Sequence, residues 1–112
     1  MFPVYCYNPI MANVREILDL MGKISKKDEE LIVKAYDFAL RGHLNQKRMN
    51  GDPYFFHVFE TAKILAKLGM DTETITAGLL HDILEDTEIK EEIVEKEFGG
   101  NILFLVKGVT KL

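Results

Sequence analysis

Hydrophobic residues recur every three or four positions along most of the chain, which is the spacing of an amphipathic helix. Glycines and turn residues interrupt this pattern at intervals. The predicted helices span about residues 13–21, 27–42, 54–68, 71–86 and 88–98, with a last one from residue 101. No segment shows a convincing strand alternation. The pattern therefore predicts an all-α bundle of about five to six helices.

The segment 54–68 is predicted to be the central helix, because apolar residues cover most of its circumference. Phe55 lies on one side, and Ile64 and Leu68 lie on another. His57 belongs to the same segment, so its side chain is expected to be largely buried. A histidine in that position is more often a hydrogen-bonded core residue than a metal ligand.

The stretch AGLLHDILEDT, residues 77–87, places four ionisable residues in an apolar run. They are His81, Asp82, Glu85 and Asp86. If the helix continues through Asp86, all four fall inside one arc of roughly 140°. Acidic residues in a last turn face the negative end of the helix dipole, which disfavours them. Such a departure from a local rule indicates function, although a solvated acidic face explains it equally well.

Composition narrows the classes of protein. The 112 residues suffice for one domain, and the net charge of −4 argues against nucleic-acid binding. A single cysteine, Cys6, excludes an internal disulfide and fits the cytoplasm. No segment reaches the roughly 20 apolar residues that cross a membrane, so no membrane partner is expected. Residues 1–12 are expected to form a disordered leader before a domain at 13–112.

Two imidazoles and one carboxylate are candidate metal ligands. His57 and the pair His81-Asp82 come from two predicted helices, and this donor set suits Mn, Fe, Zn or another divalent ion. Glu85 and Asp86, one turn further on, have the chemistry to orient or deprotonate a water. In the loop before the central helix, a guanidinium such as that of Arg48 suits a phosphate or the face of a base. An ordinary basic surface loop is the simpler interpretation of that segment.

Three motifs together resemble one family. HLNQKRMNGDPYFFH, ITAGLLHDILEDT and FGGNILFLVKGVTKL are similar to the N-terminal HD hydrolase domain of RelA/SpoT homologue proteins and to small alarmone hydrolases, over about residues 28–112. The resemblance implies an all-helical, metal-dependent phosphohydrolase. Its expected reaction removes pyrophosphate from the 3′ position of ppGpp or pppGpp and leaves GDP or GTP. The cofactor implied is Mn²⁺.

The resemblance also implies a role for each matching residue. The expected metal ligands are His57, His81 and Asp82, and the expected catalytic pair is Glu85 and Asp86. The expected substrate contacts are Arg48, Met49, Asn50, Lys111 and Leu112.

Two departures from the family pattern keep alternatives open. The family usually has lysine where Met49 stands, which leaves another nucleotide such as NADPH as a candidate substrate. The family also takes a fourth metal ligand from a later helix, and this sequence ends at Leu112. We therefore expect the N-terminal part of an HD domain. A non-catalytic helical module, or a homo-oligomer formed through exposed apolar surface, is the other hypothesis.

Overall fold

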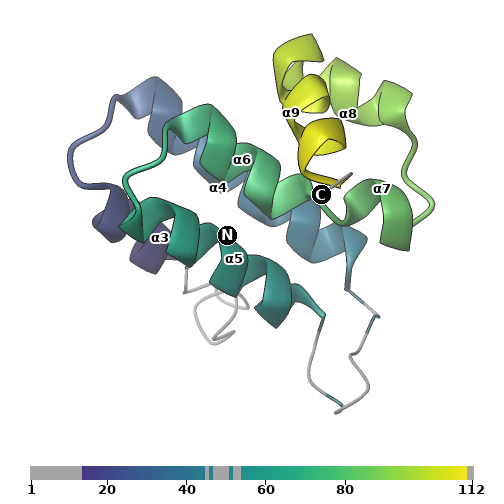
Figure 1. Cartoon of the computed structure of the whole chain (residues 1–112), viewed down its shortest axis with the longest axis horizontal. Coiled ribbons are helices and arrows are strands. Elements are labelled where there is room, and N and C mark those ends of the chain that lie inside the picture. The colour runs from purple at the N-terminus through teal and green to yellow at the C-terminus, as the bar shows by residue number, and fades with distance from the viewer. Residues whose placement is uncertain (1–13, 45, 47–50, 52–53, 111–112) are drawn as a thin grey trace, which may run out of the picture.

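The computed structural model describes residues 14–44, 46, 51 and 54–110, and these form helices joined by short turns (Figure 1). Strands are absent from this described part of the chain. The helices are α3 (Val14–Met21), α4 (Lys26–Gly42), α5 (Phe55–Lys67), α6 (Thr72–Leu80), the single turn α7 (Ile83–Asp86), α8 (Glu91–Phe98) and α9 (Gly100–Thr110). The all-α prediction is confirmed. The predicted leader, residues 1–12, lies outside the described residues.

Helix α6 is the central element of the fold. Every residue from Ile75 to Leu80 is buried, and the helix packs against α4, α5 and α9. The prediction that the segment 54–68 is central is wrong. Helix α5 buries one face, but Ile64 is 55% exposed and Leu68, just after the helix, is 65% exposed. The uncharged run from Ile75 to Leu80 in α6 is thus buried on all sides. Helix α5 carries charged residues on its second face, and these keep that face in solvent.

The buried stripe of α4 follows helical spacing. Ile32, Ala35, Tyr36 and Ala39 are buried, whereas Phe38 is only partly buried. These positions are three and four residues apart, as expected for one helix face. The stripe meets α5 through aromatic packing, since the Tyr36 ring lies edge-on to Phe55 at a centroid distance of 4.9 Å.

Side-chain caps fix where two of the helices begin. Asp71 accepts a hydrogen bond from the backbone N–H of Thr74 at 2.8 Å at the start of α6, and Ser25 accepts one from Asp28 at 3.0 Å at the start of α4. Such caps satisfy backbone donors that have no partner inside the helix. The Asp71 bonds to Thr74 also lower the pKa of the Asp71 carboxyl. The register of α6, and so the position of the residues that follow it, is set from this end.

Two glycines let neighbouring helices approach closely. A Cβ at Gly78 on α6 would lie 2.5 Å from Leu65 Cδ1 on α5, and a Cβ at Gly42 on α4 would lie 2.5 Å from Ile83 Cδ1 on α7. Real Cβ atoms do not tolerate such distances, so a side chain at either position would displace its neighbour. Glycine at these positions therefore lets α5 lie close to α6, and α7 lie close to α4.

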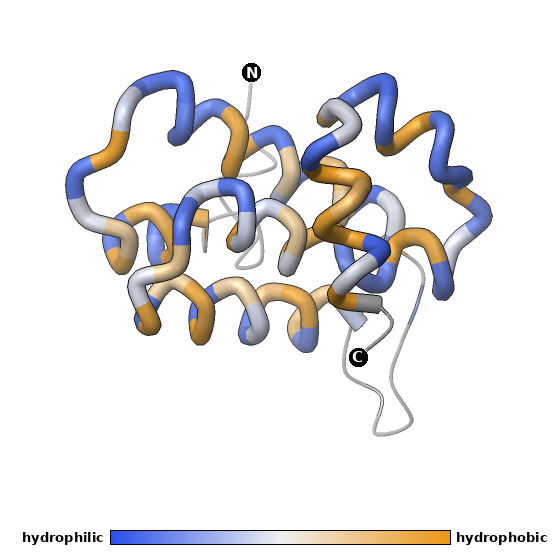
Figure 2. Tube along the Cα trace, turned by 45° about the horizontal axis from the view of Figure 1, so that its top comes forward, coloured by the Kyte–Doolittle hydropathy of each residue, from blue (hydrophilic) through white to orange (hydrophobic). Residues whose placement is uncertain are grey.

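Hydrophobic and hydrophilic positions alternate along the helices, as expected when each helix buries one face (Figure 2). Among the described helices, none has both the length and the apolar character that a membrane span requires.

Replacing Gly78 by valine tests the close approach of α5 and α6. We expect Gly78→Val to lower the free energy of unfolding by about 1–3 kcal/mol, because the new side chain overpacks the contact with Leu65. Gly108→Val is the matched control, since a Cβ at Gly108 on α9 meets no atom within 4 Å. Urea unfolding followed by circular dichroism measures both. Equal stability of the two variants would contradict the packing described here.

Candidate metal centre

The helix that leads into the site is interrupted where the chemistry begins. Helix α6 ends at Leu80, His81 and Asp82 form a turn, and α7 starts at Ile83. The prediction of one continuous helix through Asp86 is therefore wrong, and the single arc of four ionisable residues does not describe the site. Asp82 has φ −95° and ψ −2°, in the sparsely populated bridge region where many active-site residues lie. Because of this turn, two adjacent residues can face the same point.

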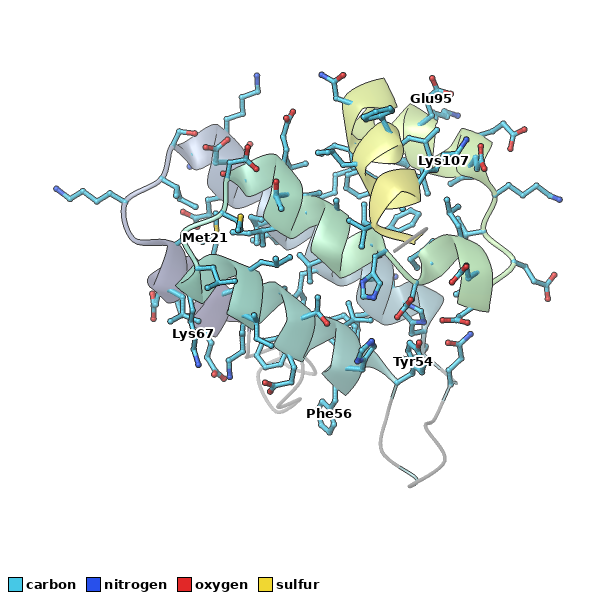
Figure 3. The ribbon with its side chains drawn as sticks, in the orientation of Figure 1. Met21, Tyr54, Phe56, Lys67, Glu95 and Lys107 are labelled. Carbon is cyan, nitrogen blue, oxygen red and sulfur yellow. The ribbon has the colours of Figure 1, made fainter. Side chains whose placement is uncertain are left out.

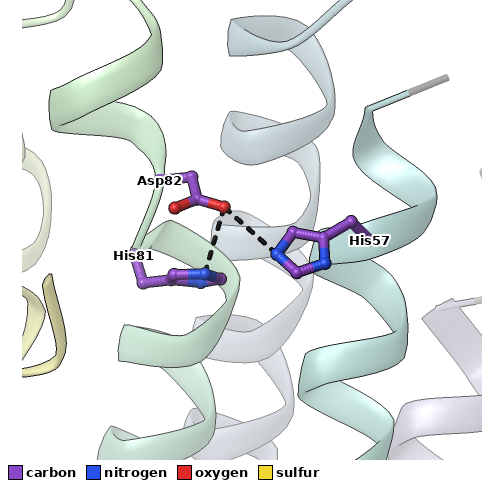
Figure 4. A group of neighbouring side chains, drawn as sticks. All are labelled: His57, His81 and Asp82. Atoms are coloured by element: carbon purple, nitrogen blue, oxygen red, sulfur yellow. Dashed lines mark ion pairs between the residues drawn. The ribbon is translucent and has the colours of Figure 1, made fainter. Parts of the chain in front are cut away.

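His57, His81 and Asp82 meet at one carboxylate oxygen (Figure 4). Asp82 Oδ2 lies 3.1 Å from His81 Nε2 and 3.4 Å from His57 Nε2. His57 comes from α5 and the other two residues from the turn after α6. The side chains of His81 and Asp82 are 15% and 13% exposed, whereas that of His57 is 39% exposed. The expectation that His57 is largely buried is wrong, because it lies at the solvent edge of the first turn of α5.

A backbone hydrogen bond selects the tautomer of His81. Its Nδ1 lies 2.6 Å from the carbonyl oxygen of Gly78. A carbonyl only accepts, so Nδ1 carries the proton in this contact. In the neutral ring the lone pair is then on Nε2, the atom that faces Asp82. Metal-binding histidines are commonly oriented in this way by a carbonyl or carboxylate at their other nitrogen.

The distances between these groups fit a shared cation. Two ligand atoms that each lie about 2.1 Å from one ion, at 90–110° to each other, are roughly 3.0–3.4 Å apart. The two nitrogen-to-oxygen distances fall in this range, and one ligand atom from each residue lies within 4.8 Å of the others. Imidazole and carboxylate together suit Mn²⁺, Fe²⁺ or Zn²⁺. The residues present therefore fit a divalent cation, whose identity the donor set leaves open.

Charge complementarity within the centre shifts two pKa values. Burial alone would lower the pKa of His81, but the hydrogen bond and charge of Asp82, with the Gly78 carbonyl, raise it overall. Burial alone would raise the pKa of Asp82, but the hydrogen bond and charge of His81 lower it overall. The centre thus favours a negative Asp82 beside a positive charge.

Tyr54 joins the centre to Asp86 and was not predicted from the sequence. Its hydroxyl lies 2.9 Å from Asp82 Oδ2 and 2.9 Å from Asp86 Oδ2. Burial, followed by these two carboxylates, raises the pKa of the Tyr54 hydroxyl well above its usual value. The spacing of Tyr54 and His57, three residues apart at a helix start, was the sequence signal that could have placed both on one face. Figure 3 shows Tyr54 beside the first turn of α5.

His43 and Gln46 support this group from the end of α4, and the sequence analysis missed both. His43, not His57, is the buried histidine, with 1% exposure. Its Nδ1 lies 2.8 Å from Gln46 Oε1, and its ring stacks on Tyr54 at a centroid distance of 5.0 Å. The Gln46 amide in turn donates to the backbone carbonyl of Asp86. The loop before α5 is therefore tied to α7 through side chains.

The two residues of the predicted catalytic pair are both exposed and line one groove, but only Asp86 is linked to the centre. Asp86 is linked to the centre through Tyr54. Glu85 is exposed and is not among the residues whose ligand atoms cluster. It lines a groove of about 750 Å³ together with Arg41, Gln46 and Asp86. The predicted substrate contacts lie outside the described residues; they are Arg48, Met49, Asn50, Lys111 and Leu112.

Comparison with known proteins identifies the family. The profile of the HD domain family matches residues 35–112, which include the whole candidate centre. The chain belongs to the HD domain family. The predicted resemblance to the HD regions of RelA/SpoT-type proteins is confirmed by the relatives described next.

These relatives carry the names of alarmone enzymes. The chain is 51% identical over 101 residues to a guanosine-3′,5′-bis(diphosphate) 3′-pyrophosphohydrolase of Aquifex aeolicus, covering 90% of this chain and 14% of that protein. It is 45% identical over 107 residues to a GTP pyrophosphokinase of Streptomyces coelicolor, covering 95% of this chain and 13% of that protein. A probable guanosine-3′,5′-bis(diphosphate) 3′-pyrophosphohydrolase of Mycoplasma genitalium is 45% identical over 107 residues, covering 91% of this chain and 15% of that protein. The chain spans about one seventh of the length of these relatives.

Cation binding tests the centre directly. We expect His81→Ala to weaken Mn²⁺ binding at least tenfold, an order of magnitude typical of disturbed metal sites, because it removes one of three ligand side chains. Isothermal titration calorimetry of the chain with Mn²⁺ measures this. Glu73→Gln removes an exposed carboxylate in the first turn of α6, at the other end of that helix, and serves as the control. Unchanged Mn²⁺ affinity in His81→Ala would show that the cation binds elsewhere.

The pKa shifts predict how stability depends on pH in the presence of a chelator. His81 has a raised pKa, so its contribution is complete below its unfolded value of about 6.5 and is lost as pH rises through the folded value. Asp82 has a lowered pKa, so its contribution is complete above 3.8 and is lost as pH falls through the folded value. The pair therefore stabilises the cation-free chain most between these two pH values.

Thermal unfolding of the chain and of Asp82→Asn, both with EDTA, measures this effect. We expect the difference in free energy of unfolding between the two to be largest near pH 5–6 and to shrink toward pH 9. A difference that stays constant over this range would contradict the coupling of His81 to Asp82.

Proposed function

We propose that this chain provides the metal centre of an HD hydrolase that releases pyrophosphate from the 3′ position of ppGpp or pppGpp. One structural observation supports the hydrolase above all others: two histidine Nε2 atoms converge on Asp82 Oδ2. The substrate is supported by relatives, at 45–51% identity, that are named for this reaction or for GTP pyrophosphokinase.

His57, His81 and Asp82 would hold the cation, and we propose Mn²⁺ as that cation. When bound, a divalent ion lowers the pKa of water and offsets charge on a phosphate oxygen. The other groups then handle the proton and the substrate. In the proposed reaction the oxygen of a water attacks the phosphorus bonded to O3′, and the bond from that phosphorus to O3′ breaks. Pyrophosphate leaves, and the O3′ atom takes up a proton to give GDP or GTP.

Asp86 is the proposed acceptor of the proton from water, because Tyr54 links its carboxylate to the centre. Glu85, which lines the adjoining groove, is the proposed second acidic residue of the catalytic pair. The proposed substrate contacts are Arg48, Met49, Asn50, Lys111 and Leu112. Arg41, on the same groove as Glu85, donates from its Nε to both carboxylate oxygens of Asp37, each at 3.0 Å. The cytoplasmic location of the protein and its assembly into a homo-oligomer are predictions from the sequence.

Pyrophosphate release from ppGpp with Mn²⁺ tests the proposal. The assay compares the full product of the gene with its His81→Ala, Asp86→Asn and Glu73→Gln variants. We expect kcat to fall by about 10²–10⁴-fold in Asp86→Asn, the usual contribution of a general base. We expect His81→Ala to lose Mn²⁺-dependent activity and Glu73→Gln to keep it. A protein that binds Mn²⁺ at this centre yet leaves ppGpp intact would contradict the proposed substrate.

A further inference from the structure

The hydroxyl of Tyr54 lies between two carboxylates that have different tasks in the proposed reaction. It is 2.9 Å from Oδ2 of Asp82, a proposed cation ligand, and 2.9 Å from Oδ2 of Asp86, the proposed proton acceptor. The two carboxylate oxygens are therefore no farther apart than twice that distance. A tyrosine hydroxyl has one hydrogen, so it donates to only one of the two carboxylates at a time.

The Tyr54 side chain is held in place from several sides. Its backbone N–H donates to the carbonyl of Gln46 at 2.9 Å, and its ring stacks on the buried His43 at an interplanar angle of 29°. The His57 ring meets it edge-on at a centroid distance of 5.7 Å. The hydroxyl group is at the end of this ring. Because the ring is held in place, the position of the hydroxyl oxygen between the two carboxylates is fixed as well.

Among the described residues, Tyr54 is the one side chain that is hydrogen-bonded to the Asp86 carboxylate. Asp86 is the last residue of the one-turn helix α7, and it is exposed. An exposed carboxylate on a single helical turn samples several rotamers unless a partner selects one. Gln46 holds the backbone carbonyl of Asp86, which leaves the direction of the side chain to the Tyr54 hydroxyl.

We propose that Tyr54 is a positioning residue that orients the Asp86 carboxylate toward the metal centre. The inference rests on the proposed function for its catalytic consequence. A cation bound through Asp82 Oδ2 would withdraw electron density from that oxygen and make it a weaker hydrogen-bond acceptor. Donation of the Tyr54 hydrogen to Asp86 would then be favoured. Cation binding and the orientation of Asp86 are thereby coupled through one hydroxyl group.

Tyr54→Phe removes the hydroxyl and keeps the ring that stacks on His43. Tyr36→Phe is the matched control, since Tyr36 is a buried tyrosine of the same core whose hydroxyl has no hydrogen-bond partner among the described residues. In the full gene product we expect Tyr54→Phe to lower kcat by about 10- to 100-fold, as for other supporting contacts of metal sites. We expect KM and the Mn²⁺ dissociation constant to change less than about threefold, and Tyr36→Phe to leave all three unchanged.

A double-mutant cycle separates positioning from a general structural role. If Tyr54 acts through Asp86, Tyr54→Phe has no further effect on kcat in an Asp86→Asn background. Equal losses in both backgrounds would overturn the proposal. A loss of Mn²⁺ affinity as large as the loss of kcat would also overturn it, because Tyr54 would then support Asp82 alone.

A spectroscopic measurement tests the contact without any activity. In the chain labelled with ¹³C at the aspartate carboxyl carbons, at fixed pH and with one equivalent of the diamagnetic ion Zn²⁺, we expect Tyr54→Phe to move the Asp86 signal and Tyr36→Phe to leave it in place. An unmoved Asp86 signal overturns the positioning role whatever the substrate is. If the Asp86 signal moves but the protein does not hydrolyse ppGpp, the contact between Tyr54 and Asp86 is supported and only the proposed function is refuted.

Discussion

The Oδ2 atom of Asp82 is the point on which the arrangement of the site depends. Three groups meet it: Tyr54 and His57 from the start of α5, and His81 from the turn after α6. A negative or metal-bound oxygen strengthens these contacts. The close approach of α5 to α6 at Gly78 brings these two parts of the chain together. The packing of the core helices therefore also sets the positions of the side chains at the site.

The interruption of the helix after Leu80 solves a geometric problem. Successive residues on a helix point about 100° apart, so adjacent side chains do not share a small target. The turn at His81 and Asp82 allows both to reach one point, and the hydrogen bond from His81 Nδ1 to Gly78 anchors this turn to the last turn of α6. The rigid part of the site therefore rests on the buried part of α6, from Ile75 to Leu80. The proposed proton acceptor lies on the exposed single turn that follows, where a hydroxyl is needed to orient it.

Much of this could be predicted from local pattern, and the failures have physical causes. Helix positions, the metal-ligand candidates His57, His81 and Asp82, and the link of Asp86 to that region follow from spacing and residue type. The break after Leu80 did not, because no glycine or proline marks it in the sequence. The burial of His57 was overestimated, because periodicity says which face a residue occupies but not how far the core extends along the helix.

The missed residues share a feature. Tyr54, His43 and Gln46 act through contacts between the end of α4, the start of α5 and α7, which are up to 40 residues apart in sequence. Such long-range side-chain networks leave almost no periodic signal. The buried His43 and the spacing of Tyr54 and His57 become meaningful only once the fold has brought these elements together.

His57 and His81 are proposed to bind one cation together with Asp82. Pulsed electron paramagnetic resonance of the chain with one equivalent of Mn²⁺ counts the imidazole nitrogens bound to the ion. We expect couplings from two histidines in the wild-type chain and from one in His57→Ala. Couplings from no histidine, or an unchanged count in His57→Ala, would contradict this proposal.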